Sequence, residues 1–230
     1  MMNKKVLVIA AHPDDEVLGC GGTIIKHVED NDEVHSMILA EGITSRDVDR
    51  NLLLRGTELK TLHENSNLVA KIMGVKDLEM HDFPDNRMDS VPLLDIVKKI
   101  ETKIEIFQPN IVYTHHSGDV NIDHTITHNA VVTACRSLPG QCVKRILFFE
   151  TLSSTEWQMQ TGSKIFKPNW YVEIAKTFEK KMKALKCYSS EMRKYPHPRS
   201  YEGVKILAQY RALTIGGEYA EAFSLGRNIE

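Results

Sequence analysis

A histidine and two aspartates stand together in the segment AHPDDE, residues 11–16, near the start of the sequence. His12 and Asp15 offer one nitrogen and one oxygen ligand, a pair that suits a divalent metal such as zinc. Asp14 is then left over, close enough to act on a water molecule at that metal. These residue types predict a metal centre with a free carboxylate beside it.

The neighbouring sequence predicts that this segment lies in a turn between a strand and a helix. Residues 5–10 form a short apolar run typical of a buried strand, and residues 17–25 look like the start of a helix. In open α/β sheets such a turn lies at the carboxyl edge, where ligands bind. Proline and acidic residues are also common at helix starts, so the segment alone fits a helix cap as well. His12 favours the metal site, because a cap has no use for an imidazole.

A second group of candidate ligands occupies residues 118–128, GDVNIDHTITH, between a predicted strand end and a predicted helix start. We therefore expect it at the same sheet edge as His12. His124 and His128 are four residues apart and would share one helical face. A lone histidine on a helix is more often packed or solvated than ligating, but Asp123 and His124 would here face an independent His/Asp pair. Three protein ligands and a water would make an open catalytic site.

The rest of the chain alternates between strand and helix patterns. Strands are predicted at 33–40, 78–81, 111–114, 145–149 and 170–174, and helices at 50–73, 91–107, 124–136 and 176–187. Strands that alternate with helices indicate βαβ units and a mainly parallel sheet, which is an α/β fold. We expect a single domain over residues 1–230, with residues 151–230 as a C-terminal extension packed on the α/β core.

Length, charge and cysteine content argue against several other classes of protein. A chain of 230 residues can bury a sizeable core. Its net charge of −2, without a long basic run, argues against nucleic acid or an anionic membrane as a partner. We see no secretory signal and no apolar run of membrane-spanning length. The four cysteines form no Cys-x-x-Cys pair, so we expect a cytoplasmic protein with reduced thiols. Assembly into a homo-oligomer stays open.

These motifs resemble those of the zinc-dependent de-N-acetylases. That family includes N-acetylglucosaminyl-phosphatidylinositol deacetylases and the deacetylases of bacterial thiol-sugar and antibiotic pathways. The similarity rests first on AHPDDE at residues 11–16 and on NIDH at residues 121–124. Arg55 stands where the family carries an arginine that contacts substrate. Residues 83–85 (FPD) resemble its second acidic turn, and residues 219–223 (YAEAF) resemble its C-terminal signature.

The resemblance implies a Rossmann-like, three-layer α/β sandwich with a catalytic metal ion. By this similarity His12, Asp15 and His124 would hold zinc, although two histidines and one carboxylate also suit Fe²⁺. Asp14 would match the general base of the family, which takes a proton from water and passes it to the leaving amine. The expected reaction hydrolyses the N-acetyl group of an amino sugar or sugar conjugate and releases acetate and a free amine.

The sequence departs from the family at Asn121, where many members carry a histidine that helps to stabilise or protonate the tetrahedral intermediate. An amide can donate a hydrogen bond to an oxyanion but cannot deliver a proton. Either Asp14 serves as both base and acid, or His115, His116 or His128 supplies the proton. Loss of activity is the third reading.

Three residues are expected to contact the sugar, namely Arg55, Asp85 and His116. For Arg55 and Asp85 the alternative is an ordinary surface salt bridge. Asp123 need not touch the metal, because it would either orient a neighbouring side chain or cap the helix that follows.

The sequence does not identify the substrate. Without a membrane anchor, a soluble N-acetylated sugar is favoured over a lipid-linked one. The basic residues of 176–193 and the segment 197–200 could reach towards a phosphate on the sugar, but we prefer to interpret them as solvated surface.

Other functions fit less well. A nucleotide-binding enzyme would need Gly-x-Gly-x-x-Gly after the first strand. Gly19 and Gly21 supply the first two glycines, but Ile24 takes the third position. A metal- or sugar-binding protein without catalysis is supported only by Asn121, and release of acetate would separate it from an enzyme. A hydrolase of another amide is the remaining alternative.

Overall fold

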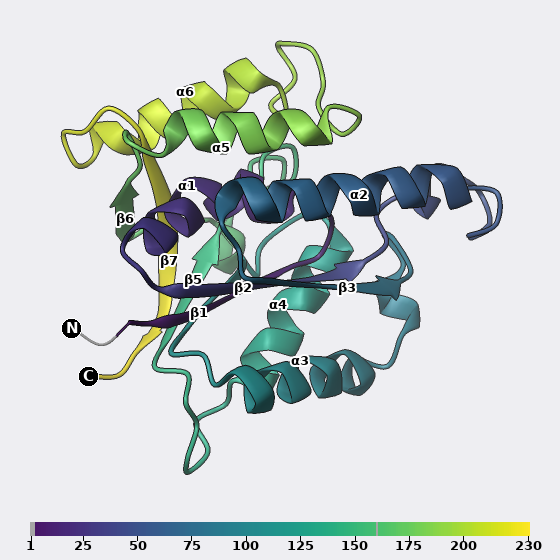
Figure 1. The fold of residues 1–230 in the computed structure, drawn as a ribbon, viewed down its shortest axis with the longest axis horizontal. Helices are drawn as coiled ribbons and strands as arrows, with labels where there is room; N and C mark the ends of the chain where they lie inside the picture. The colour runs from purple at the N-terminus through teal and green to yellow at the C-terminus, as the bar shows by residue number, and fades with distance from the viewer. Residues whose placement is uncertain (1–2, 160) are drawn as a thin grey trace.

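The protein is described by a computed structural model that covers residues 3–159 and 161–230 and contains one seven-stranded sheet with helices on both faces (Figure 1). The strands are β1 (Lys5–Ala10), β2 (Glu33–Ala40), β3 (Asp77–Phe83), β4 (Ile111–His115), β5 (Arg145–Phe149), β6 (Trp170–Glu173) and β7 (Ala220–Asn228). The α-helices are α1 (Asp15–Glu29), α2 (Gly56–Met73), α3 (Leu93–Phe107), α4 (Ile122–Ala134), α5 (Phe178–Leu185) and α6 (Tyr201–Leu213). Over the described residues, none of these helices is long and apolar enough to cross a membrane.

The sheet contains both parallel and antiparallel pairs, and strand β7 makes all of its antiparallel ones. Its order is β3-β2-β1-β4-β5-β7-β6. The five strands from β3 to β5 pair in parallel, whereas β7 runs antiparallel to both β5 and β6. The predicted α/β fold with a mainly parallel sheet is therefore confirmed. Neither α6 nor β7 is among the elements that the sequence patterns predict.

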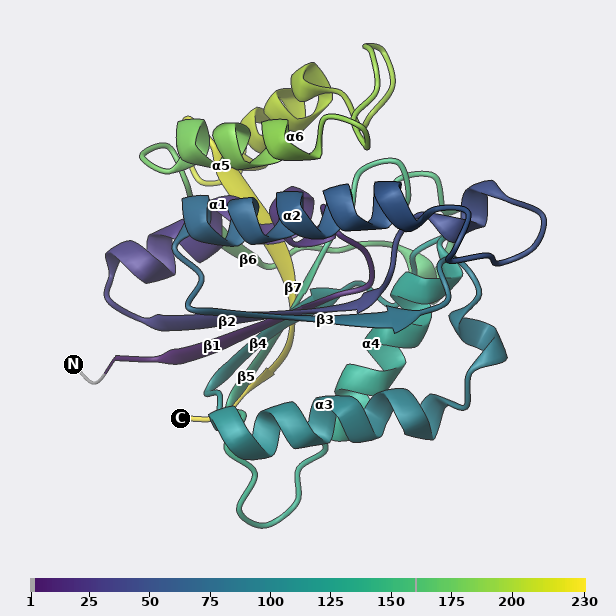
Figure 2. The ribbon, with the colours of Figure 1, turned by 45° about the vertical axis from the view of Figure 1, so that its right-hand side comes forward.

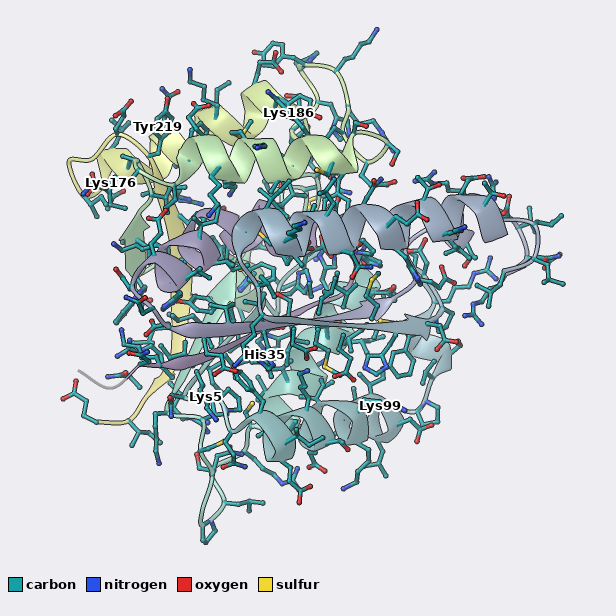
Figure 3. All side chains as sticks on the ribbon, viewed as in Figure 1. Lys5, His35, Lys99, Lys176, Lys186 and Tyr219 are labelled. Carbon is teal, nitrogen blue, oxygen red and sulfur yellow. The ribbon has the colours of Figure 1, made fainter. Side chains whose placement is uncertain are left out.

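Alternate side chains of β1 belong to two separate cores. Val6 and Val8 join a cluster with α1, α2 and the C-terminal helices, whereas Leu7 and Ile9 join a cluster with α3 and α4. Because successive side chains of a strand point to opposite faces, a strand covered on both faces needs a continuous apolar run. The turned view shows α3 and α4 on one side of the sheet and the other helices on the opposite side (Figure 2). Side chains fill both layers, and His35 of β2 stacks on an aromatic ring at the end of α3 (Figure 3).

Helix α1 is interrupted at Cys20, where a φ of −149° and a ψ of 21° leave the helical region. The break frees backbone groups that other elements then satisfy. Glu221 of β7 accepts two of the N–H groups at 2.9 and 2.7 Å, and Lys181 of α5 donates to the carbonyl oxygen of Leu18 at 3.0 Å. Lys181 and Glu221 are themselves a buried ion pair at 2.6 Å. The C-terminal elements are therefore bonded directly to the helix that follows AHPDDE.

Helix α2 begins at Gly56, later than the predicted residue 50. Asn51 explains part of the difference, because its side-chain oxygen accepts the N–H groups of residues 53 and 54 at 3.1 and 3.3 Å. Such a bond offers the backbone an alternative to the helix. The residues before α2 form turns instead.

Candidate metal centre

The AHPDDE segment and the start of α4 meet at the carboxyl edge of the sheet. His12 follows β1, Asp15 begins α1, and His124 lies in the first turn of α4, which follows β4. Strands β1 and β4 are parallel neighbours, so their ends bring these segments together. The rings of His12 and His124 have centroids 5.4 Å apart.

His12, Asp15 and His124 form a compact group of ligand-type atoms. One nitrogen or oxygen from each lies within 4.8 Å of the others. Oδ2 of Asp15 is 3.2 Å from Nδ1 of His12 and 3.2 Å from Nε2 of His124. The side chains of Asp15 and His124 are 1% exposed, while His12 keeps 13%, so solvent reaches the group at His12.

Two carboxylates outside the group, here called the outer carboxylates, fix which nitrogen of each histidine faces the group. Oδ2 of Asp123 lies 3.0 Å from Nε2 of His12, and Oδ2 of Asp119 lies 3.1 Å from Nδ1 of His124. A carboxylate accepts the ring N–H, which leaves the lone pair on the other nitrogen. Nδ1 of His12 and Nε2 of His124 can therefore bind a cation.

Two buried atoms of the group have no hydrogen-bond partner. Among the described residues, none bonds to Oδ1 of Asp15 or to Nε2 of His124, whose approach to Asp15 lacks hydrogen-bond geometry. A buried polar atom without a partner costs about 1–3 kcal/mol, and a cation bound to both atoms would remove that cost. One carboxylate and two imidazoles suit zinc or Fe²⁺. The residues present fit the expected metal ion.

The charges around His124 also favour a cation. Burial by itself would lower the pKa of His124, but the carboxylates of Asp15 and Asp119 raise that pKa to about 9. Burial disfavours the charge on Asp15, yet the positive charge of His124 beside it holds the pKa of Asp15 well below the usual value. Asp15 is therefore an anion in a site that attracts positive charge.

A third histidine, His115 at the end of β4, stacks on His124 with ring centroids 4.0 Å apart. Its Nε2 accepts the backbone N–H of Ala11 at 2.9 Å, and its Nδ1 lies 3.3 Å from Oγ1 of Thr151. Burial and the neighbouring His124 lower its pKa well below the usual value. His115 is therefore a neutral ring with both nitrogens engaged, which suits neither a ligand nor a proton donor.

Asp85 and Asp123 face the opposite nitrogen of His12. Oδ1 of Asp85 lies 3.3 Å from Nε2 of His12, and the three residues could also hold a cation by distance alone. However, Asp123 already accepts two backbone N–H groups of residues 86 and 88 at 2.6 and 3.0 Å. Asp85 accepts from residues 45 and 86 at 3.1 and 2.9 Å. Since these oxygens are already hydrogen-bonded, the pair is better suited to orient His12 than to bind a second ion.

Asn121, and not Asp123, caps α4. Oδ1 of Asn121 accepts the N–H of Asp123 at 2.9 Å, and its Nδ2 donates to Oδ1 of Asn86 at 2.9 Å. The alternative that Asp123 caps the helix is therefore wrong, whereas its contact with His12 agrees with the orienting role. Because an amide nitrogen has two hydrogens, Nδ2 of Asn121 has one N–H beyond the one that it donates to Asn86.

Asp14 is held in a backbone conformation that side-chain-bearing residues rarely adopt. Its φ is 110° and its ψ is −30°, and the residue is 1% exposed. Oε2 of Glu16 accepts its N–H at 3.0 Å, and Arg199 donates from Nη1 to its Oδ2 at 3.1 Å. Burial raises the pKa of Asp14 well above its usual value, Arg199 opposes this, and Asp15 adds to it. Asp14 and Asp15 thus contact different partners, and their division into base and ligand stays a prediction.

Arg55, His116 and His128 are bonded to other parts of the protein. Arg55 forms ion pairs with Asp47 and Glu58, both at 2.7 Å. His116 and His128 each bond through one ring nitrogen to a backbone carbonyl oxygen, at 3.1 and 2.9 Å. Over the described residues, none of these bonds reaches a side chain of the metal centre. Arg55 therefore forms the surface ion pairs that were the alternative to a substrate contact. Contacts of Arg55 and His116 with substrate stay predictions.

The motifs do not reveal two residues that the structure places here, Asp119 and Arg199. Asp119 accepts from the hydroxyls of Ser154 and Thr155, the latter at 2.7 Å, besides facing His124. Its position five residues before His124 in GDVNIDH was the available signal. The interpretation of residues 197–200 as solvated surface is wrong for Arg199, whose side chain is only 22% exposed and is bound to Asp14.

The chain is similar in sequence to known deacetylases. A model of the PIG-L family, described as GlcNAc-PI de-N-acetylase, matches residues 7–135, more than half of the chain. An uncharacterized deacetylase of Escherichia coli (strain K12), YaiS, is 31% identical over 160 residues, which cover 66% of this chain and 76% of the relative. Diacetylchitobiose deacetylase of Thermococcus kodakarensis is 26% identical over 223 residues, or 95% of this chain and 81% of the relative.

The fold is also that of a solved deacetylase structure. The N,N'-diacetylchitobiose deacetylase from Pyrococcus horikoshii superposes with a TM-score of 0.77 at 23% identity, covering 97% of this chain and 84% of that one. With the family match over AHPDDE and NIDH, these similarities establish that the chain belongs to the PIG-L family of de-N-acetylases.

Proposed function

We propose that this protein is a metal-dependent deacetylase that hydrolyses the N-acetyl group of an amino sugar or sugar conjugate. The products are acetate and a free amine. The observation that carries the proposal is the group His12, Asp15 and His124, in which an outer carboxylate orients each histidine. A soluble N-acetylated sugar is the proposed substrate, because the related diacetylchitobiose deacetylase is named for such an activity.

The metal would be held by His12, Asp15 and His124, with zinc or Fe²⁺ as the proposed ion. When bound, such an ion makes a coordinated water more acidic and polarises the amide carbonyl. Asp123 and Asp119 keep the two imidazoles in the tautomers that this binding needs.

Asp14 is proposed to act as both base and acid. Arg199 occupies its Oδ2, so Oδ1 is the oxygen that accepts the proton of the attacking water. The same proton then passes to the amine nitrogen as the C–N bond breaks. We adopt this reading of the Asn121 position because His115 has both nitrogens engaged and His116 and His128 are bonded elsewhere.

The test is release of acetate from purified protein that has been stripped of metal and reloaded with zinc or Fe²⁺. Substrates would be N-acetylglucosamine, N,N'-diacetylchitobiose, N-acetylated sugar nucleotides and aminoglycoside precursors. We expect acetate and amine in equal amounts, and no release when a chelator is present. If the metal-loaded protein bound these sugars without releasing acetate, the result would support the alternative of a sugar-binding protein without catalysis. Release only from amides without a sugar would indicate a hydrolase of another amide.

A matched pair of variants tests the ligand set. His124→Ala removes a proposed ligand, while His128→Ala removes the same residue type one turn further along α4. Within the described residues, the His128 ring bonds to a backbone carbonyl oxygen alone. We expect His124→Ala to lose the metal and His128→Ala to retain it by elemental analysis. Equal metal content in the two variants would remove His124 from the site.

A further inference from the structure

We propose that Arg199 is a positioning residue for this reaction, because it holds the Asp14 carboxylate in the orientation from which Asp14 exchanges protons. The inference rests on the function proposed above. It concerns a part of the chain, between α5 and α6, that lies far from both metal-binding motifs in the sequence. Arg199 and Asp14 are separated by 185 residues.

The guanidinium of Arg199 joins two residues whose backbones are strained. Nη1 donates to Oδ2 of Asp14 at 3.1 Å, and Nε donates to Oγ of Ser153 at 3.0 Å. Asp14 has a φ of 110° and Ser153 a φ of 65°, both in the region that favours glycine. Such conformations persist only where surrounding contacts enforce them, and they cluster at functional sites. Their meeting at one guanidinium indicates that this arrangement serves the site.

The backbone of Arg199 is itself fixed. Its carbonyl oxygen accepts the N–H of Arg193 at 2.9 Å. The next residue, Ser200, is fully buried and caps α6 by accepting the N–H of Gly203 at 2.9 Å. A side chain at Gly203 would bring its Cβ within 2.1 Å of a backbone oxygen in the same segment. The arginine therefore extends towards Asp14 from a tightly packed turn.

The chemistry of arginine limits it to holding the carboxylate. A guanidinium stays protonated, so Arg199 cannot replace the missing histidine as an acid. Its planar donors point in fixed directions, which lets it restrain a carboxylate by one oxygen. Among residues 3–159 and 161–230, none forms a hydrogen bond with Oδ1 of Asp14, whereas Arg199 binds its Oδ2. Arg199 thus determines which oxygen of Asp14 is left to receive the proton.

The test is a double-mutant cycle on the metal-loaded enzyme, with Arg199→Met, Asp14→Asn and the double variant. We expect Arg199→Met to lower kcat about 10²-fold, because a small misplacement of a reacting group has effects of that size. KM should change less than about twofold. In the Asp14→Asn background, the same substitution should change kcat less than about twofold, because Arg199 acts through Asp14.

Two further variants separate this role from general support of the fold. Arg193→Met is the matched control, because Arg193 belongs to the same segment and, among the residues that the structure describes, its side chain donates only to the backbone carbonyls of residues 190 and 192. Its kcat should equal that of the wild type. Arg199→Lys keeps the charge but loses the planar fork, so its kcat should lie between those of the wild type and Arg199→Met.

Thermal unfolding of the same proteins without metal gives a readout that does not depend on turnover. The midpoint shifts of Asp14→Asn and Arg199→Met should not add in the double variant, because both remove one ion pair. Additive midpoint shifts, or an equal loss of kcat in both Asp14 backgrounds, would overturn the proposal. If the wild type released no acetate, the proposed function would fail, and the unfolding cycle would still decide whether Arg199 holds Asp14.

Discussion

Replacing Asp14 by glycine should stabilise the fold relative to replacing it by alanine, although both variants should be inactive. At most positions the order is the reverse, since glycine loses more conformational freedom on folding. Asp14 differs because its φ of 110° and ψ of −30° place a Cβ where it meets its own backbone. Both substitutions remove the same buried carboxylate and the same bond to Arg199, so the comparison isolates the backbone.

The expected size of the difference follows from two opposing terms. A non-glycine residue in a sparsely populated backbone region costs about 1–3 kcal/mol. Glycine costs roughly 0.5–1 kcal/mol relative to alanine through the unfolded chain. Because the conformation of Asp14 lies well away from the favoured left-handed centre, at about +57° and +47°, we take the upper half of the strain range. The net gain for glycine is then about 1–2.5 kcal/mol, or roughly 2–10 °C in Tm for a chain of this length.

The assay is thermal and urea unfolding of metal-stripped protein, so that binding of metal does not add to stability. An internal control uses Glu64, which is exposed on α2, where Glu64→Gly should be less stable than Glu64→Ala by about 1 kcal/mol. Opposite orders at the two positions are the expected result. An Asp14→Ala protein more stable than Asp14→Gly by the ordinary difference of roughly 0.5–1 kcal/mol would show that the backbone at this position is not strained.

Four further outcomes are expected. Asp14→Asn should retain metal by elemental analysis and lose about 10²–10⁴-fold in kcat, whereas near-normal turnover would eliminate Asp14 as the base. Asp119→Ala should weaken metal affinity about 10–100-fold in a competition titration, since His124 loses the carboxylate that fixes its tautomer. In urea titrations, Lys181→Met should lower the free energy of unfolding by about 3–5 kcal/mol, because it leaves the Glu221 carboxylate buried and unpaired. The double variant Lys181→Met/Glu221→Gln should recover part of that loss. Burial lowers the pKa of His27 below its ordinary 6.5, and the opposing effect of Asp32 is smaller. Because the unfolded chain therefore protonates His27 at a higher pH than the folded protein does, stability should fall as the pH drops below about 6.5. His27→Gln should show a shallower loss over that range.

The parts that could be predicted from the sequence are those set by local pattern. Apolar runs mark β1 and β2 because both faces of these strands are covered, and residues 5–10 and 33–40 match the observed bounds. Parallel pairing then brings His12 and His124 to one edge, since the carboxyl ends of neighbouring parallel strands adjoin. The fold class and the candidate ligand group both follow from such patterns.

The remaining parts depend on long-range packing. Helix α6 carries apolar residues on its outer face, with Ile206 52%, Tyr210 62% and Leu213 76% exposed, so apolar and polar positions do not separate along the sequence. Strand β7 acquires its place from pairing with β5 and β6, which single-segment patterns do not contain. The tautomer-fixing role of Asp119 and the contact of Arg199 likewise depend on which segments meet in space. Asn121 took the cap that Asp123 could equally have supplied, because both residue types suit helix starts.

The bonding of Glu221 to the break in α1 has a consequence for synthesis of the chain. The carboxylate that accepts the N–H of Gly22 lies 199 residues further along. A ribosome adds about 5–20 residues per second, so the break remains uncapped for roughly 10–40 s after it is made. Strand β5, once it has been made, likewise lacks its neighbour β7 until residues 220–228 follow, and its unpaired edge is a site for aggregation. Protection by chaperones would matter most while β7 is still missing.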